Sequence, residues 1–150
     1  MNLTEDDLAI RTLVACYADA VNRYDAQAWA STWAPQGEWI LRQGDSKVGR
    51  EAIVDFWDSI MASLKFAIMI PGSAQINIQG QGATGRWYMT EIVEEKQGPG
   101  SHIVGVYNDH YIKLDQQWYF QSRQYHMLYQ TPTNAEGIYQ PLPAEQLLTL

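Results

Sequence analysis

The sequence has little of several things that commonly reveal a function. It holds one cysteine among 150 residues, Cys16, so an internal disulfide is excluded and a reducing compartment is expected. No apolar run reaches the length of a membrane span, and residues 1–30 lack the basic start and apolar core of a secretion signal. We therefore predict a soluble, cytoplasmic protein with no membrane partner. Cys16 has no activating neighbour in the sequence and is predicted to fill the core.

Positive charge is also scarce. The chain has 10 Lys and Arg against 17 Asp and Glu, which gives a formal net charge of −7 and leaves no basic patch for nucleic acid. His102, His110 and His126 do not share a metal-site spacing with the carboxylates. The glycine-containing residues 79–82 precede a strand pattern, which favours a hairpin turn over a phosphate-binding loop. We predict neither a metal nor a cofactor.

The composition is that of a folded protein. Hydrophobic residues make up 46% and charged residues 18% of the chain, and its length suits one domain with a real core. There is no internal repeat and no low-complexity linker. We predict one domain over residues 1–150, with a core at about 4–130 and a surface tail over 131–150, where three prolines fall.

Helical spacing of apolar residues dominates the first part of the chain. Thr4 and Asp7 resemble a capping box, and a stripe of apolar residues follows it at positions 10, 13, 14, 17, 21 and 24. Asp25 is predicted to cap a short second helix from Ala26 to about Trp33, which the segment 33–37 ends through Pro35 and Gly37. A third helix is predicted after Gly49.

From Phe66 onward the period changes to two, which is typical of strands. The pattern predicts strands at 66–70, 74–79, 83–95, 102–114 and 117–130. Turn residues separate them at 71–72, at 98–100 and at Asp115–Gln116, and residues 43–46 are predicted to form an earlier turn.

Alternation also assigns side chains to the two faces of this sheet. The odd positions share one face: Trp87, Met89, Glu91, Tyr107, Asp109, Tyr111, Arg123 and Tyr125. The even positions include Val104, Val106, Phe120 and Leu128, so the second face is partly apolar as well. A sheet with two apolar faces needs two covers, and we predict helices on one face and a second subunit on the other, in a homodimer.

Several segments together resemble one family. They are Tyr17 to Asp25 with Trp33-Ala34-Pro35 and Trp39, residues 48–53, residues 82–88, and residues 105–109 with Trp118 and Arg123. In this order they resemble, over about residues 8–130, the SnoaL-like branch of the NTF2-like superfamily. That branch includes polyketide cyclases, scytalone dehydratase, steroid Δ5-isomerase and a dehydrochlorinase. The resemblance implies an α+β cone, in which a strongly curved, mostly antiparallel sheet wraps around N-terminal helices and an apolar pocket lies in its mouth.

The resemblance carries over the family's catalytic residues unevenly. The catalytic aspartate and histidine of the dehydratase and the dehydrochlorinase correspond to Asn22 and to a position near Met69, and neither side chain shuttles a proton near neutral pH. The general base of the steroid isomerase falls near Leu41. Tyr17 and Asp109 match the isomerase pair that binds a developing oxyanion, a role that requires Asp109 to be protonated.

The remaining polar residues of the predicted pocket face complete the candidate site. Glu91 is the best available acid or base, with Tyr17 and Asp109 as catalytic partners and Asn22, Arg123 and Tyr107 as substrate-binding groups. The predicted pocket walls are Trp33, Trp39, Phe56, Met69 and Trp87.

Structural alternatives stand beside these assignments. Tyr17 also fits a core tyrosine, Asn22 a helix end, and Glu91 an ion pair with Arg86 or Arg123. Asp109 also fits a strand aspartate satisfied by Arg123 or Tyr107, and a strong ion pair with Arg123 would argue against the donor role.

Three functions are compatible with these residues. The first is a cofactor-independent lyase or isomerase, such as a dehydratase, a cyclase or a double-bond shift enzyme, acting on an apolar ring compound. The second is a non-catalytic protein that binds a small hydrophobic ligand. The third is an assembly subunit similar to the β-subunits of ring-hydroxylating dioxygenases. A polar cluster in an open cavity favours the first, a purely apolar cavity the second and a filled cavity the third.

Overall fold

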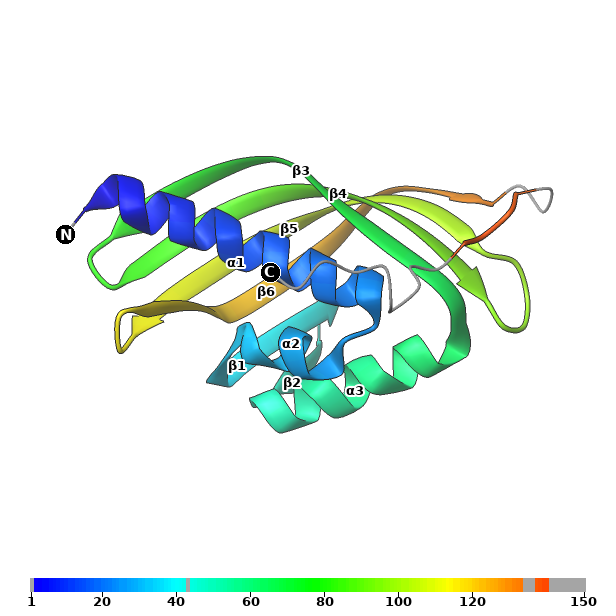
Figure 1. Cartoon of the computed structure of the whole chain (residues 1–150), viewed down its shortest axis with the longest axis horizontal. Helices are drawn as coiled ribbons and strands as arrows, with labels where there is room; N and C mark the ends of the chain where they lie inside the picture. Colours follow the sequence, from blue (N-terminus) through cyan, green and yellow to red (C-terminus); the bar gives the residue numbers. More distant parts are fainter. Residues whose placement is uncertain (1, 43, 134–136, 141–150) are drawn as a thin grey trace.

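The computed structural model describes residues 2–42, 44–133 and 137–140, which form three helices and one six-stranded sheet (Figure 1). The elements are α1 (Leu3–Arg23), α2 (Ala26–Ser31), β1 (Trp33–Arg42), β2 (Asp45–Val48), α3 (Arg50–Ser63), β3 (Leu64–Gln79), β4 (Gly82–Glu95), β5 (Ser101–Leu114) and β6 (Gln117–Pro132). The strand order is β2-β1-β6-β5-β4-β3. Neighbouring strands are antiparallel except β1 and β6, which are parallel. The predicted α+β class is confirmed.

The sheet is curved, and α1 lies across its concave face while α2 and α3 lie beside β1 and β2 (Figure 1). We call the face toward α1 the inner face and the opposite one the outer face. The predicted apolar stripe of α1 is buried at Ile10, Val14, Tyr17 and Val21. It packs on the inner face because a helix with one apolar side must cover it against another layer.

The helices begin close to where the sequence predicts, with one change of cap. Asp25 caps α2, as predicted, with its carboxylate accepting from the amide of Ala28 at 2.9 Å. At α1 the predicted capping box of Thr4 and Asp7 is wrong. Asn2 is the cap instead, because its side-chain oxygen accepts from two free amides of the first turn, and α1 therefore begins at Leu3.

Two prolines lie inside strands rather than at the ends of elements. The second helix ends at Ser31, and β1 runs through Pro35, where the pairing with β6 shifts register. The two strands predicted around Pro71 are one strand, β3, which has a register shift between Pro71 and Ala74. A proline is tolerated at a bulge or on an edge strand because no ladder hydrogen bond needs its missing N–H, and β3 is an edge strand.

The turns agree with the sequence more closely. Asp115 and Gln116 both have positive φ, 48° and 67°, as a tight two-residue hairpin requires, so the predicted β5–β6 hairpin is confirmed. In the predicted turn over 43–46, Asp45 and Ser46 belong instead to β2, and residue 43 lies outside the described residues. Residues 98–100 form a loop between β4 and β5.

The register confirms the predicted inner face for the odd positions of β4 and β5, with one correction on β6. Trp87 is paired with Tyr107, and Asp109 with Arg123. The register of β5 and β6 shifts between His110 and Tyr111, which pairs Tyr111 with Phe120. This shift moves Phe120 from the predicted outer face into the core, where it is fully buried.

A cluster of aromatic rings fills the space between the helices and β1. Trp29 stacks on Trp57 with ring centres 4.7 Å apart, and Trp33 and Trp39 pack against Trp29 at 5.7 and 5.4 Å. Cys16, by contrast, is exposed on α1, so the prediction that it fills the core is wrong.

Only part of the predicted tail can be assessed. Its first two residues, 131–132, continue β6, and Tyr139 packs on Phe66 with ring centres 5.2 Å apart. Residues 134–136 and 141–150 lie outside the described residues. The single domain remains a prediction.

Candidate active site

A cavity of about 190 Å³ lies between the helices and the inner face of the sheet. Apolar side chains of α1, α3 and the strands β1, β3, β4, β5 and β6 form most of its wall. Among the lining residues that the structure describes, Glu91 is the one carboxyl, and the other polar groups are the hydroxyls of Tyr17, Tyr107 and Tyr125 and the indoles of Trp39 and Trp57. This combination of an apolar wall and a few polar groups is typical of a site for a small molecule.

Glu91 has the chemistry that a proton-transfer group needs. It lies midway along β4, where alternation turns it inward, and it is half-buried in the cavity wall. No described residue forms a hydrogen bond or an ion pair with its carboxyl group. Burial raises the pKa of Glu91 from 4.5 to about 7, and the positive charge of Arg123 opposes this shift. A carboxyl with this pKa can both accept and return a proton near neutral pH.

Two of the three tyrosines in the wall are deeply buried. Tyr17 on α1 and Tyr107 on β5 have ring centres 6.5 Å apart, and Tyr107 packs against Tyr125 at 5.1 Å. Burial raises the pKa of Tyr17 and of Tyr107, and the charge of Arg123 again opposes the shift. Both phenols are therefore neutral hydrogen-bond donors at physiological pH. The burial of Tyr17 also agrees with the alternative of a core tyrosine.

Asp109 is buried but does not line the cavity. Its Oδ1 accepts from Nε of Arg123 at 2.9 Å, and its Oδ2 accepts from Nη2 of Arg123 at 3.2 Å and from the hydroxyl of Tyr111 at 2.7 Å. Burial raises the pKa of Asp109, while Arg123 and Tyr111 act in the opposite direction. Both oxygens accept from protein donors, which is the pattern of a carboxylate and gives no support to the predicted donor role.

Arg123 is likewise enclosed by protein. Its guanidinium carbon lies 4.3 Å from the ring centre of Tyr17, 3.9 Å from that of Tyr107 and 4.2 Å from that of Phe120. The side chain is fully buried and does not line the cavity. Arg123, which was predicted to bind substrate, therefore does not reach the cavity. Its guanidinium is held by cation–π contacts behind the tyrosines of the cavity wall.

Asn22 has a structural partner for each end of its amide. Its Nδ2 donates to the carbonyl of Met69 at 3.0 Å, and its Oδ1 accepts from the amide of Met69 at 2.7 Å. These two hydrogen bonds join α1 to β3 in the way that a neighbouring strand would pair with the Met69 backbone. Asn22 and Met69, the positions that the resemblance relates to a catalytic aspartate and histidine, therefore bond to each other, and of the two only Met69 lines the cavity.

Of the aromatic residues predicted to form the pocket wall, only Trp39 lines the cavity. Its indole N–H is buried without a partner among the described residues. Trp33 and Phe56 lie behind it in the aromatic cluster, and Trp87 lies beside Asp109, where its indole donates to Tyr111 at 2.9 Å. The cavity is also lined by residues that were not predicted from the sequence: Trp57, Ile60 and Met61 of α3, and Tyr125 and Met127 of β6. The periodicity of α3 and the odd positions of β6 were the available signals.

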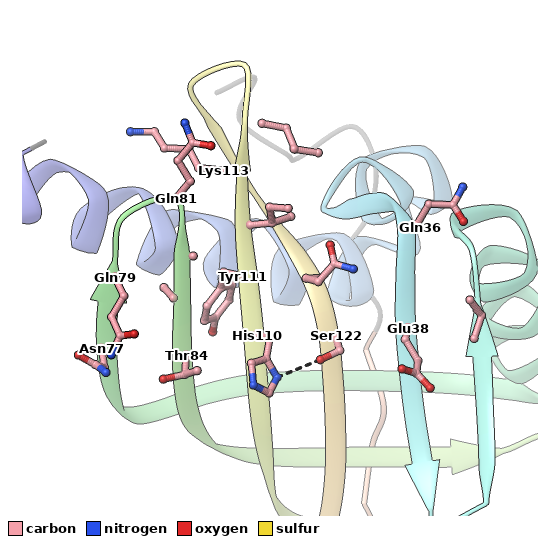
Figure 2. A pocket seen from close by; sticks show the side chains of 16 residues that line it. Gln36, Glu38, Asn77, Gln79, Gln81, Thr84, His110, Tyr111, Lys113 and Ser122 are labelled. Atoms are coloured by element: carbon pink, nitrogen blue, oxygen red, sulfur yellow. Dashed lines mark hydrogen bonds between the residues drawn. The ribbon is translucent and has the colours of Figure 1, made fainter.

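A larger hollow of about 770 Å³ lies on the outer face, across the strands from β3 to β2 (Figure 2). Figure 2 shows Asn77, Thr84, His110, Ser122 and Glu38 on the side away from α1, with His110 Nδ1 and Ser122 Oγ 3.1 Å apart. The hollow is open, and none of the described side chains that line it has a buried polar atom without a hydrogen-bond partner. Size alone therefore does not make it the candidate active site. No group of His, Cys, Asp or Glu within the described ranges could hold a metal ion.

Comparison with known proteins agrees with this architecture. Residues 2–124 match the SnoaL-like domain, and the chain belongs to that family. No protein of curated function matches the chain. None of the helices in the described part of the chain is long and apolar enough to cross a membrane.

Three solved structures illustrate how well the fold agrees. A provisionally assigned scytalone dehydratase from Novosphingobium aromaticivorans has a TM-score of 0.81 at 18% identity, over 93% of this chain and 94% of its own. A hexachlorocyclohexane dehydrochlorinase of type 3 from Novosphingobium barchaimii has 0.81 at 20% identity, over 93% and 97%. An NTF2-like protein with a cystatin-like fold from Novosphingobium aromaticivorans has 0.71 at 26% identity, over 84% of both chains. The predicted NTF2-like fold is confirmed.

Proposed function

We propose that this protein is a cofactor-independent lyase or isomerase that moves a proton on a small apolar ring compound, with Glu91 as the general acid and base. The observation that carries the proposal is a carboxyl group without a protein partner in the wall of an apolar cavity, where burial raises the pKa of Glu91 to about 7. Perturbed carboxyl groups in apolar cavities are typical of catalytic acids and bases. The solved dehydratase and dehydrochlorinase of the same fold support a reaction that begins by removing a proton from carbon.

The chemistry that the cavity supports is simple. The carboxylate of Glu91 accepts a proton from a ring carbon, and the electron pair of the C–H bond becomes part of a new double bond. Glu91 then returns the proton to another carbon, which gives an isomer, or to a departing group, which gives an elimination. A neutral phenol among the wall tyrosines Tyr17, Tyr107 and Tyr125 stabilises negative charge on the substrate by hydrogen bonding.

The Asp–His pair of the relatives has no counterpart in this mechanism. The resemblance relates those positions to Asn22 and Met69, which bond to each other, so in this proposal the proton-transfer group comes from β4 instead of α1. The same absence favours the alternative of a binding protein, in which the cavity holds its ligand without changing it. The open cavity argues against a purely scaffolding role of the fold.

Deuterium exchange distinguishes the enzyme from the binding protein. One- and two-ring ketones are incubated with the protein in D₂O, and loss of the proton beside the carbonyl is followed by NMR. We expect catalysed exchange, reduced about 100-fold or more in Glu91→Gln, since general acid–base groups contribute about that much. Glu95→Gln is the matched control, because Glu95 lies on the same strand but outside the cavity. A panel that binds without exchanging establishes the binding protein instead.

A further inference from the structure

A tyrosine of β6 reaches into the cavity because one residue of β5 has no side chain. A Cβ atom built on Gly105 would lie 2.4–2.6 Å from three atoms of the Tyr125 side chain, including the hydroxyl oxygen. A larger residue there would push the Tyr125 ring out of this position. The end of the Tyr125 ring therefore lies over β5, the strand between β6 and β4, and β4 carries Glu91.

The same arrangement occurs once more, deeper in the molecule, and provides a comparison. The side chain of Tyr111 on β5 lies across Gly85 of β4, where an added Cβ would be 2.8 Å from its hydroxyl. That hydroxyl is fully used, since it donates to Asp109 and accepts from Trp87. This tyrosine is a structural part of the buried ion pair.

The hydroxyl of Tyr125 is different. Its oxygen is buried, lies at a cavity-lining residue and has no hydrogen-bond partner among the described residues. Buried hydroxyls are nearly always bonded, so one that faces a cavity indicates a partner supplied from outside the chain. The charge of Glu91 contributes to raising the pKa of Tyr125, which agrees with their proximity.

We propose that Tyr125 is the group that recognises substrate oxygen, and that the substrate is a one- or two-ring ketone bound with its carbonyl at the Tyr125 hydroxyl. This inference rests on the proposed function of the cavity. A tyrosine hydroxyl at neutral pH donates, so its partner is an acceptor. Trp39 offers a second unpaired donor, but β6 and β5 separate its strand from β4, while the end of the Tyr125 ring lies over β5, next to β4.

The two side chains then divide one reaction between them. The Glu91 carboxylate takes the proton from the carbon beside the carbonyl, the C–H electron pair forms the carbon–carbon double bond, and the carbonyl π electrons move to oxygen. Tyr125 stabilises that oxygen by its hydrogen bond. Glu91 then gives the proton back to carbon, the carbonyl reforms, and both side chains return to their initial states. No oxidant, reductant or metal takes part.

The cavity volume limits the ligand. An apolar cavity of about 150 Å³ holds benzene, so a space of about 190 Å³ suits one ring or two fused rings. The pair 1-indanone and indane fits this limit and differs only in the carbonyl oxygen. It therefore measures the contribution of a hydrogen bond to that oxygen directly.

The test is an NMR titration of both compounds against three proteins. Wild type is expected to bind 1-indanone about five-fold more tightly than indane, the ratio that one neutral hydrogen bond of about 1 kcal/mol gives. Tyr125→Phe is expected to bind both equally. Tyr111→Phe, the matched control, is expected to lower the melting temperature but keep the preference, because its hydroxyl never meets the ligand. Gly105→Ala displaces the Tyr125 ring and is expected to lose the preference as well.

Each outcome decides between the two proposals. Equal binding of both compounds by wild type, or a preference that survives in Tyr125→Phe, overturns the role of Tyr125, while the exchange assay on Glu91→Gln separately decides the role of Glu91. Failure of wild type to bind either compound overturns both. Should Gly105→Ala not fold, Tyr125→Phe alone still decides.

Discussion

At the scale of single residues, surroundings rather than residue type separate two carboxyl groups on the same face of the sheet. Asp109 accepts three hydrogen bonds from Arg123 and Tyr111, whereas Glu91 has no protein partner and faces an apolar cavity. Alternation along the strands placed both inward, but it could not show which one meets the cavity. That difference depends on where Arg123 goes, and a strand pattern does not encode it.

The pH dependence of Glu91 is a direct test of its environment. Its pKa is higher in the folded chain, about 7 against an ordinary 4.5, so its contribution to stability is complete below about pH 4.5 and is lost as the pH rises through 7. Glu91→Gln should therefore be stabilising relative to wild type at pH 8, on the order of 1–3 kcal/mol, and nearly neutral at pH 5. Thermal unfolding at the two pH values measures this. Exchange by wild type should rise with pH and level off above about 7.

Asp109 is expected to behave as a structural residue. Asp109→Asn leaves the fully buried guanidinium of Arg123 without its counter-charge, which costs about 3–5 kcal/mol in comparable buried pairs. Denaturant unfolding should show this loss. A variant of wild-type stability with lost exchange activity would instead restore Asp109 to the site as an oxyanion donor.

At the scale of elements, the sequence predicted the order of helices and strands but not where the strands bend. Pro35 and Pro71 were interpreted as ends of elements, although each lies at a register shift within a strand. Whether a proline ends a strand depends on whether a neighbouring strand needs its N–H, which is a property of the assembled sheet. The shift beside Tyr111 has the same origin, and it brings Phe120 into the core.

A second element-scale feature joins the start of α1 to the β5–β6 hairpin. Asp6 accepts from Nζ of Lys113 at 2.7 Å and from the indole of Trp118 at 2.8 Å, and both partners lower the pKa of Asp6. A lowered carboxyl pKa stabilises the fold above its ordinary value of 3.8, and that stability is lost as the pH falls through the folded value.

Lys113→Met is therefore expected to lower the melting temperature at pH 7 and to have a smaller effect near pH 2. Amide hydrogen exchange should quicken in the first turns of α1 and not in α3. An unchanged exchange pattern would mean that packing alone holds the start of α1.

At the scale of the whole molecule, the outer face of the sheet is expected to be covered by a second subunit. Tyr88 is 43% exposed on that face and is paired across the strands with Val106. We predict a dimer in sedimentation at micromolar concentration, which Tyr88→Arg converts to a monomer. Leu8→Arg is the control, because Leu8 is 64% exposed on α1, on the opposite side. A dimer that persists in Tyr88→Arg uses another surface.

The parallel pair of β1 and β6 also governs how the chain can fold. Every other pair of neighbouring strands is consecutive in the sequence, whereas β1 ends at Arg42 and β6 begins at Gln117. During synthesis, the tryptophans of α2 and β1 therefore remain without their packing partners on β6 until that strand has been made. Phe120 packs on Trp33 only when that strand arrives. The pairing of β6 with β1, which closes this long loop, is expected to be the slow step of folding. Until then, the exposed aromatic cluster is expected to be the main binding surface for chaperones.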